Sequence, residues 1–567
     1  MRLRIHSAHI ILTFAFTVML FLSAQFGDNV QPKAATASTS VPISFKASSQ
    51  ASAAFEEGWL QMTLAETFPE DGSPPVSHTR YYLVDNNGQA TELPREMASH
   101  VSMLKPGSQV RIWGFERGVS GELRARGGRP PHIQLLQAPL AIEKTGDHNV
   151  IYLLASFEGQ EENPFSPSDM AKLVDEVSAE FNLMSRARVR LLSHKPTAWL
   201  RVPGQLNCDL FDMARRVDAV AREAQIPIDE YRYRVYILPN KPDCPFGGVA
   251  TVGGDPARAW INDFRKGIVV HEYGHAGFGR LHANLWRCPD IFDSTTPNCS
   301  AESSNPYSAM GGGLLQLLFS PQDMKDLGWT RMLAVNNQNM GRVFRLVASD
   351  LNLPVGENEI ESLEIQFADL TTRVYIDVRR NVEEPSVRNG VLAYLEGKPP
   401  AGNPASEFHS TYLIPEGNPQ DPRQRNHGLE LGKSLVIGHN MITVVAADAQ
   451  GAAVYVDNHL DASPPSAIIK SAVRTKKSVI ITGAVEDNLI VSRVELWITK
   501  KNKRGIVEKF QLDNFTPKQQ SEILATEIAL PKKQSASIQM VAYDSLDNVG
   551  FSAEVSVKKW KATSLSR

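Results

Sequence analysis

The sequence predicts a multidomain chain of the α/β plus β class, with one unit of alternating strands and helices between β-rich units. At 567 residues the chain is too long for a single hydrophobic core. Strand-like apolar runs alternate with amphipathic helical segments over residues 146–335. Short strand-like runs separated by turn residues fill 55–145, 336–460 and 461–560. A hydrophobic content of 42% with 21% charged residues is typical of globular protein.

The N-terminus has the pattern of an export signal. A basic start precedes an apolar run of 15 residues, Ile10–Ala24, which is shorter than the roughly 20 residues of a membrane-spanning helix. We expect residues 1–24 to be a signal peptide and 25–54, rich in Ala, Ser and Thr, to be a flexible linker. An uncleaved anchor is the alternative. The mature protein should be secreted, extracellular or periplasmic, without a stable membrane span.

The chain has four cysteines, and an exported protein reaches a compartment that permits disulfides, so we expect the cysteines to pair. Three pairings are open. Proximity favours Cys288–Cys299, which leaves Cys208–Cys244. The net charge of −3 attracts neither nucleic acid nor an anionic membrane, so we expect no nucleic-acid partner. We also expect a monomer.

The β-rich segment 55–145 should form a small β-barrel or sandwich, either OB-like or propeptide-like. The α/β unit should begin with the strand "NVIYLLASF", followed by a helix with Ser166 as its N-cap. Further along the chain, 336–460 should form a β-sandwich and 461–560 an immunoglobulin-like domain.

The segment "HEYGH", His271 to His275, contains the residues of a catalytic zinc site. Residues four apart share one face of a helix, so both imidazoles can bind one Zn²⁺ ion. A catalytic zinc needs a third protein ligand and one position for water. Glu272 can act as the general base that takes the proton of this water.

The third ligand we expect is His282. Gly277 and Gly279 suit the end of a helix, where glycine accepts the left-handed conformation that turns the chain back. The sequence thus assigns one catalytic zinc ion to His271, His275 and His282. No sequence motif indicates a calcium-binding site, and nothing in the sequence excludes one.

These residues resemble the motif of the metzincin metallopeptidases, His-Glu-x-x-His-x-x-Gly-x-x-His, with one extra residue between His275 and Gly279. "NPYSAMGGG" resembles the methionine turn of that family and places Met310 beneath the metal. "HEYGH", "GRLHA", "AMGGG" and "SPQDMKDLGW" follow in the order found in gametolysin-type peptidases. The resemblance implies a zincin catalytic domain in a secreted zinc endopeptidase acting on proteins or glycoproteins.

That reading leaves two alternatives: a secreted adhesion protein with a degraded or structural metal site, and a zinc amidase acting on a cell wall. No cysteine precedes Cys208, so the segment 55–145 cannot inhibit through a cysteine switch. Tyr307, His409 and His427 read as structural residues. Glu359 and Glu361 alternate along a strand-like stretch and should form a solvated face.

Overall fold

The computed structural model describes most of the chain after residue 54. The predicted signal peptide and linker lie outside the described residues, as do Cys288, Cys299, His409 and His427. The described residues are 55–67, 76–94, 97, 100–101, 104–117, 123–125, 132–160, 165–196, 198–239, 244, 246–287, 300–302, 305–311, 318–351, 359–367, 373–380, 389–396, 411–414, 428–438, 440–500, 507–512, 515–531 and 533–559.

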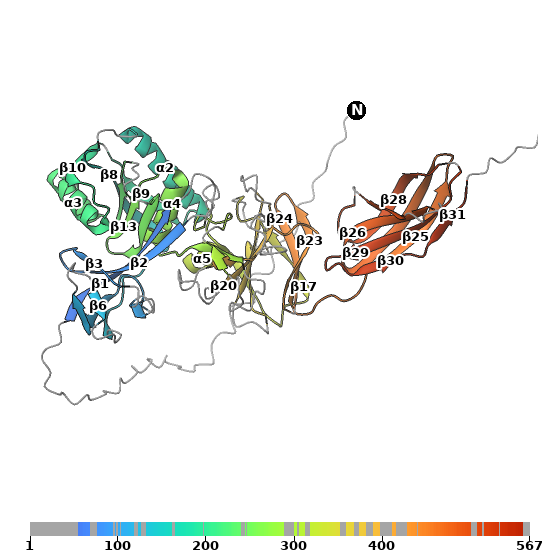
Figure 1. Cartoon of the computed structure of the whole chain (residues 1–567), viewed down its shortest axis with the longest axis horizontal. Helices are drawn as coiled ribbons and strands as arrows, with labels where there is room; N and C mark the ends of the chain where they lie inside the picture. Colours follow the sequence, from blue (N-terminus) through green and yellow to red (C-terminus); the bar gives the residue numbers. More distant parts are fainter. Residues whose placement is uncertain are drawn as a thin grey trace, which may run out of the picture. The chain divides into compact units, whose positions relative to one another are not determined.

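The first sheet has 11 strands within the described residues and includes the predicted α/β unit (Figure 1). Its order is β10-β8-β11-β13-β12-β1-β2-β3, with β9 beside β8, β4 beside β1, and β7 beside β4. The strands are β1 (Phe55–Thr67), β2 (Val76–Val84), β3 (Ala90–Glu92), β4 (Gln109–Trp113), β7 (His132–Gln137), β8 (Gly146–Glu158), β9 (Val189–His194), β10 (Trp199–Gln205), β11 (Tyr233–Ile237), β12 (Gly248–Gly254) and β13 (Ala257–Ile261). β5 (Phe115–Arg117) and β6 (Leu123–Ala125) pair separately.

Helices cover both faces of this sheet, as the alternating pattern predicts. Strand β8 pairs in parallel with β9, β10 and β11, and its residues Val150–Phe157 are all buried. A continuous apolar run is expected where both faces of a parallel strand are covered. One face packs in a core with helices α2 and α4, and the other with α3. The helices are α2 (Pro167–Met184), α3 (Leu210–Glu223), the 3₁₀ turn η2 (Ile228–Glu230), α4 (Lys266–Phe278) and α5 (Pro321–Leu327).

Helix α2 begins where the sequence predicts. The hydroxyl of Ser166 accepts a hydrogen bond from the backbone N–H of Asp169 at 3.2 Å, and the Asp169 carboxylate accepts from the N–H of Ser166 at 2.9 Å. This reciprocal capping satisfies two donors at the helix start.

The N-terminal β segment joins the α/β unit through backbone pairing. Strand β1 runs antiparallel to β12, with Thr63 opposite Thr251 and Glu66 opposite Gly248. The predicted boundary at residue 145 is therefore not a break in the sheet, and β12 has a strand on each side.

Two further sheets share one apolar core and form a sandwich. The larger contains β14 (Ala283–Arg287), β15 (Ser300–Glu302), β16 (Met332–Val335), β18 (Ser362–Ile365), β19 (Val374–Arg379), β20 (Gly390–Glu396) and β21 (Thr411–Leu413). The smaller contains β17 (Arg342–Val347), β22 (Ser434–Ile437), β23 (Asn440–Asp448) and β24 (Gly451–Asp457). Because β14 pairs with β21, the chain enters this sandwich directly after His282.

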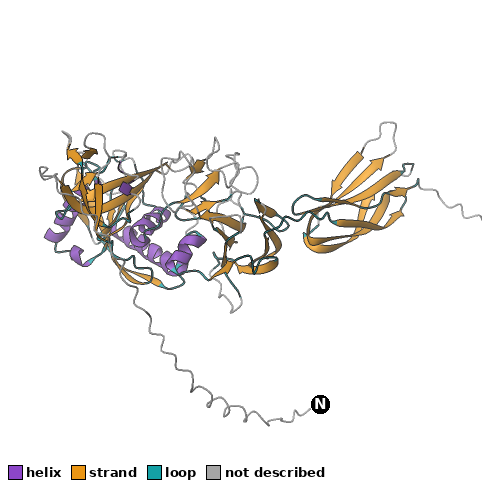
Figure 2. Ribbon diagram, turned by 90° about the horizontal axis from the view of Figure 1, so that it is seen from below, coloured by secondary structure: helices purple, strands orange, loops and turns teal. Residues whose placement is uncertain are grey.

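The C-terminal segment forms its own sheet around a separate core. Its strands are β25 (Ser466–Arg474), β26 (Ser478–Lys500), β27 (Val507–Gln511), β28 (Lys518–Ala529), β29 (Ala536–Asp544), β30 (Val549–Phe551) and β31 (Val555–Val557). Figure 2 shows that strands dominate the described chain, which is therefore a β-rich multidomain protein.

The predicted solvated face at Glu359 and Glu361 is wrong for Glu361, which is buried. Its carboxylate accepts from the guanidinium of Arg186, at 2.6 Å, and from the backbone N–H of Arg331, at 3.0 Å. An alternating acidic pattern looks exposed in the sequence, but here a distant arginine neutralises one of the two charges.

The structure confirms the predicted Cys208–Cys244 disulfide. It joins the start of α3 to the segment before β12. Among the described residues, no helix is long and apolar enough to cross a membrane.

Candidate metal centre

Helix α4 carries the first two histidines and Glu272. Its segment "GIVV" is buried and anchors the helix in the core shared with α2. His271 and His275 are four residues apart on the same face, and both are buried. A helix buried along its length provides a rigid support, which a metal site of fixed geometry needs.

The extra residue between His275 and Gly279 lengthens the helix instead of widening the turn. Helix α4 continues through Gly277 to Phe278, and Gly279 ends it in the left-handed conformation with φ 60°. The N–H of Gly279 donates to the carbonyl of His275 at 2.9 Å. Glycine suits this position because it adopts positive φ without steric cost. The chain then reverses toward the helix.

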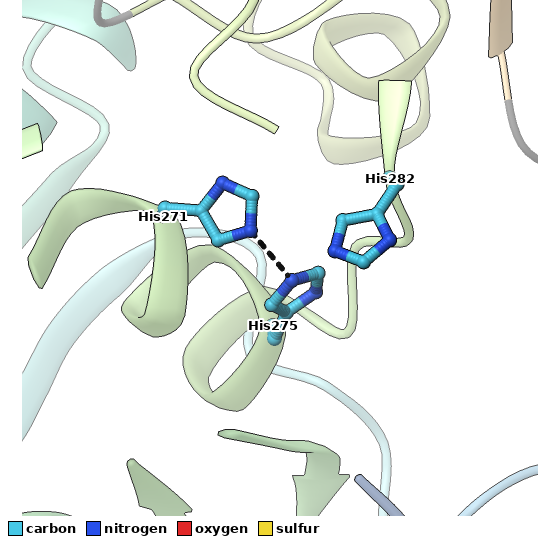
Figure 3. Close-up of side chains that lie close together, drawn as sticks. All are labelled: His271, His275 and His282. Atoms are coloured by element: carbon cyan, nitrogen blue, oxygen red, sulfur yellow. Dashed lines mark hydrogen bonds between the residues drawn. The ribbon is translucent and has the colours of Figure 1, made fainter. Parts of the chain in front are cut away.

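The reversal brings His282 to the other two histidines (Figure 3). One ring nitrogen from each of His271, His275 and His282 lies within 4.8 Å of the others. The Nε2 atoms of His271 and His275 are 3.0 Å apart. The ring centroids of His275 and His282 are separated by 4.8 Å. All three histidines predicted from the sequence are thus in one cluster.

Backbone carbonyls orient two of the rings. The Nδ1–H of His271 donates to the carbonyl of Ala309 at 2.6 Å, and the Nδ1–H of His275 donates to the carbonyl of Arg280 at 2.5 Å. In a neutral imidazole this leaves the Nε2 lone pair as the acceptor. The same arrangement fixes the tautomer of histidines that bind metals.

The donor set fits a zinc ion. Two lone pairs facing each other at 3.0 Å repel unless a cation or a proton lies between them. Two nitrogen ligands of a tetrahedral zinc are about 3.3 Å apart, and zinc readily accepts three imidazoles. The cluster of three histidines can therefore bind a metal ion.

The turn at Asn305–Gly311 supports the histidine cluster through two backbone carbonyls and the side chain of Met310. Its Ala309 carbonyl contacts His271, and its Met310 carbonyl accepts the N–H of Ala283, next to His282, at 2.7 Å. The Met310 side chain is fully buried and packs against Gly274 of α4. One turn thus holds both the first and the third histidine, while Met310 contributes packing.

Glu272 is completely buried and points toward strand β12. A Cβ placed on Gly248 would lie closer than 3.0 Å to the Glu272 carboxylate. Gly248 was not predicted as part of the site, because nothing in its local sequence marks it as the neighbour of a helix residue 24 positions later.

The "LGW" segment packs against the C-terminal end of α4. Trp329 is fully buried, and its indole N–H donates to the carbonyl of Lys144 at 2.8 Å. Its ring meets that of Phe278, the last residue of α4, with centroids 4.9 Å apart. Tyr307 is buried in an apolar cluster with Leu285 and Tyr394.

No protein-family model matches the chain, and none of the curated proteins matches it. Among solved structures, wild-type OgpA from Akkermansia muciniphila is similar at 10% identity over 75% of this chain and 96% of that chain, with a TM-score of 0.20. Catalytically inactive OgpA from the same organism, in complex with an O-glycopeptide substrate, is similar at 9% identity over the same shares, with a TM-score of 0.21. A myokine structure matches 18% of this chain and all of that chain, at 16% identity and a TM-score of 0.14. At these scores the likenesses assign no function to this chain.

Proposed function

We propose that this chain is a secreted zinc-dependent endopeptidase that hydrolyses peptide bonds of protein or glycoprotein substrates. One observation carries the proposal: three buried imidazoles converge, two of them oriented by backbone carbonyls, beside a buried glutamate. A purely structural metal site has no use for a base, so Glu272 favours catalysis over the adhesion alternative. Secretion is supported by the Cys208–Cys244 disulfide, since such bonds persist in oxidising compartments.

His271, His275 and His282 would hold the zinc, with the fourth position left for water. When bound, zinc would polarise the scissile carbonyl and lower the pKa of this water toward about 7. Glu272 would accept the proton from the water and return it to the nitrogen of the leaving amine. The buried setting of Glu272, against the bare Cα of Gly248, restricts the directions its carboxylate can take.

The test is the variant Glu272→Gln, which keeps the shape of the side chain but removes its ability to take a proton. Zinc content would be measured on the purified chain, and cleavage on a library of peptides and O-glycopeptides. We expect one zinc per chain in both proteins, and a loss of cleavage of about 10²–10⁴-fold in the variant. The matched control is Glu176→Gln, a half-exposed glutamate on α2, which should cleave like the wild type.

Each other outcome has a definite meaning. Cleavage by Glu272→Gln at the wild-type rate would overturn the mechanism. A wild-type chain without bound zinc would favour the adhesion alternative. Bound zinc with hydrolysis of cell-wall peptides, and no cleavage of protein substrates, would favour the amidase.

A further inference from the structure

A second cluster of metal-ligand side chains lies in the C-terminal sheet. It combines Asp461, in the segment before β25, with Asp487 of β26 and Asp544, the last residue of β29. One carboxylate oxygen from each lies within 4.8 Å of the others. Asp487 is 6% exposed and Asp544 is 1% exposed. Two of the three acidic groups are thus buried, and Asp461 is partly exposed beside them.

Backbone and amide groups hold these carboxylates in place. One oxygen of Asp487, Oδ2, accepts the N–H groups of Leu489 and Ile490, at 3.0 and 2.8 Å. Asp544 Oδ1 accepts the N–H of Asn548 at 2.8 Å. The side-chain amide of Asn548 donates to Asp544 Oδ2 at 2.6 Å and to the backbone carbonyl of Asp461 at 2.9 Å. Asp461 is therefore tied to the turn that follows β29.

Asp461 Oδ1 accepts the N–H of Ser463 at 2.9 Å, but two of the six carboxylate oxygens lack a partner among the described residues. Asp487 Oδ1 and Asp461 Oδ2 are buried and accept no hydrogen bond there. The ion pairs formed within the described chain involve none of the three aspartates. Burial raises the pKa of both Asp487 and Asp544, and the nearby charge of Asp461 raises them further. Like charges in a buried position are unfavourable unless a cation or protons neutralise them.

We propose that Asp461, Asp487 and Asp544 bind a divalent cation of the calcium type. An all-carboxylate set of hard oxygen ligands suits Ca²⁺, whereas zinc sites in proteins are built mainly from histidine nitrogen and cysteine sulfur. Because calcium–oxygen distances are about 2.3–2.6 Å, two ligands of one Ca²⁺ ion lie at most about 4.6–5.2 Å apart. The three carboxylate oxygens fall within this limit. Mg²⁺ needs shorter distances and near-ideal octahedral geometry. The ion would fasten the segment before β25 to strands β26 and β29.

The experiment is a calcium titration of the full, zinc-loaded chain by isothermal calorimetry, together with thermal unfolding with and without Ca²⁺. Zinc loading keeps the histidine cluster out of the measurement. We expect one binding event with a Kd of about 10⁻⁴–10⁻³ M, the range of extracellular calcium modules, and a higher unfolding temperature of the C-terminal domain.

The decisive variant is Asp487→Asn. Its side-chain oxygen can still accept the N–H groups of Leu489 and Ile490, while its NH₂ group replaces Oδ1. We expect at least about tenfold weaker calcium binding, because an amide NH₂ cannot coordinate a cation. The unfolding temperature without calcium should be equal or higher, since one like charge is removed. This second readout shows that the variant folds.

Asp547→Asn is the matched control, because Asp547 lies in the same turn but its side chain is 78% exposed. It has φ 62°, a conformation that asparagine also adopts. We expect it to bind calcium like the wild type. Absence of a calcium-dependent heat in the wild type at 10-fold above this Kd range, or equal binding by Asp487→Asn, would overturn the proposal. Neither result bears on peptide cleavage at the histidine cluster.

Discussion

Met310 packs directly against the Cα of Gly274, the residue that precedes the second histidine of α4. A Cβ at position 274 would lie closer than 3.0 Å to the sulfur of Met310 and 3.1 Å from its methyl carbon. Glycine inside a helix normally costs about 1 kcal/mol relative to alanine. Here the missing side chain makes room for the turn that supports the histidine cluster.

Gly274→Ala should therefore destabilise the chain although alanine favours a helix. Overpacking a buried site costs about 1–3 kcal/mol, more than the gain in helix propensity. In the Met310→Ala background the same substitution should be much less destabilising, because the sulfur is gone and only Phe319, 3.2 Å from the added Cβ, has to shift. Scanning calorimetry on the full chain can measure the change in the free energy of unfolding. The relevant transition is the one whose midpoint temperature also shifts when zinc is added. An equal change in the free energy of unfolding in both backgrounds would show that Gly274 and Met310 are not coupled.

His282→Ala should weaken zinc binding by about 100-fold or more, because two imidazoles from one helix leave two coordination positions without protein ligands. Affinity can be measured by competition with a chromogenic chelator. His459→Ala is the control, since the side chain of His459 is 82% exposed and lies outside the cluster. Equal affinities for the two variants would remove His282 from the ligand set.

His148 should make the chain sensitive to acid. It is fully buried, stacks on Tyr233 and shares a 3.0 Å hydrogen bond with the hydroxyl of Tyr273. Burial lowers its pKa below the ordinary value of 6.5. The unfolded chain thus takes up this proton at a higher pH than the folded chain does. The stabilisation is fully present above about pH 6.5 and is lost as the pH falls toward the lower folded pKa.

The measurement is the free energy of unfolding between pH 7.5 and about 4.5. One such group adds a slope of at most about 1.4 kcal/mol per pH unit. His148→Gln should have a shallower pH dependence than the wild type. The comparison between the two proteins removes the contribution of the other histidines. Parallel curves for the two proteins would contradict the assignment.

The pair formed by Arg186 and Glu361 should contribute more to stability than an exposed pair. The two side chains are 16% and 4% exposed. Glu361→Gln would remove the carboxylate charge that pairs with the largely buried guanidinium of Arg186, at a cost of about 3 kcal/mol. The pair of Arg190 and Asp147 is well exposed, so Asp147→Asn should change the stability far less than Glu361→Gln does. Thermal unfolding at low and at high salt would compare the two.

The candidate site could be predicted from the sequence largely because its parts are local. The spacing of His271 and His275 places both on one face of any helix. Gly277 and Gly279 both suited the helix end, and the structure ends the helix at Gly279, with Gly277 inside it. The effect of the extra residue could not be predicted, because either a longer helix or a wider turn satisfies the same sequence. The carbonyls of Ala309 and Arg280 were also missed, since every residue carries a carbonyl group.

Features formed by distant segments could not be predicted. The ion pair of Glu361 depends on Arg186, which is 175 positions away. Asp461, Asp487 and Asp544 lie in three separate segments without a common motif. In both cases an acidic residue looks solvated in its local sequence, and only tertiary packing shows otherwise.

The backbone hydrogen bonds between β1 and β12 determine how the protein would respond to proteolytic cleavage of the exposed connection between β7 and β8. Such a nick would separate two pieces of chain but leave their hydrogen bonds from Thr63 to Glu66 intact. Full departure of the N-terminal piece would uncover a row of backbone donors and acceptors on β12, beside Glu272, and an uncovered row of this kind is a template for pairing with an extended peptide. The first peptide available to pair with β12 is β1 itself, the strand that has just dissociated. A nicked molecule should therefore remain a tight two-piece assembly, and its separation would require a competing peptide or a denaturant.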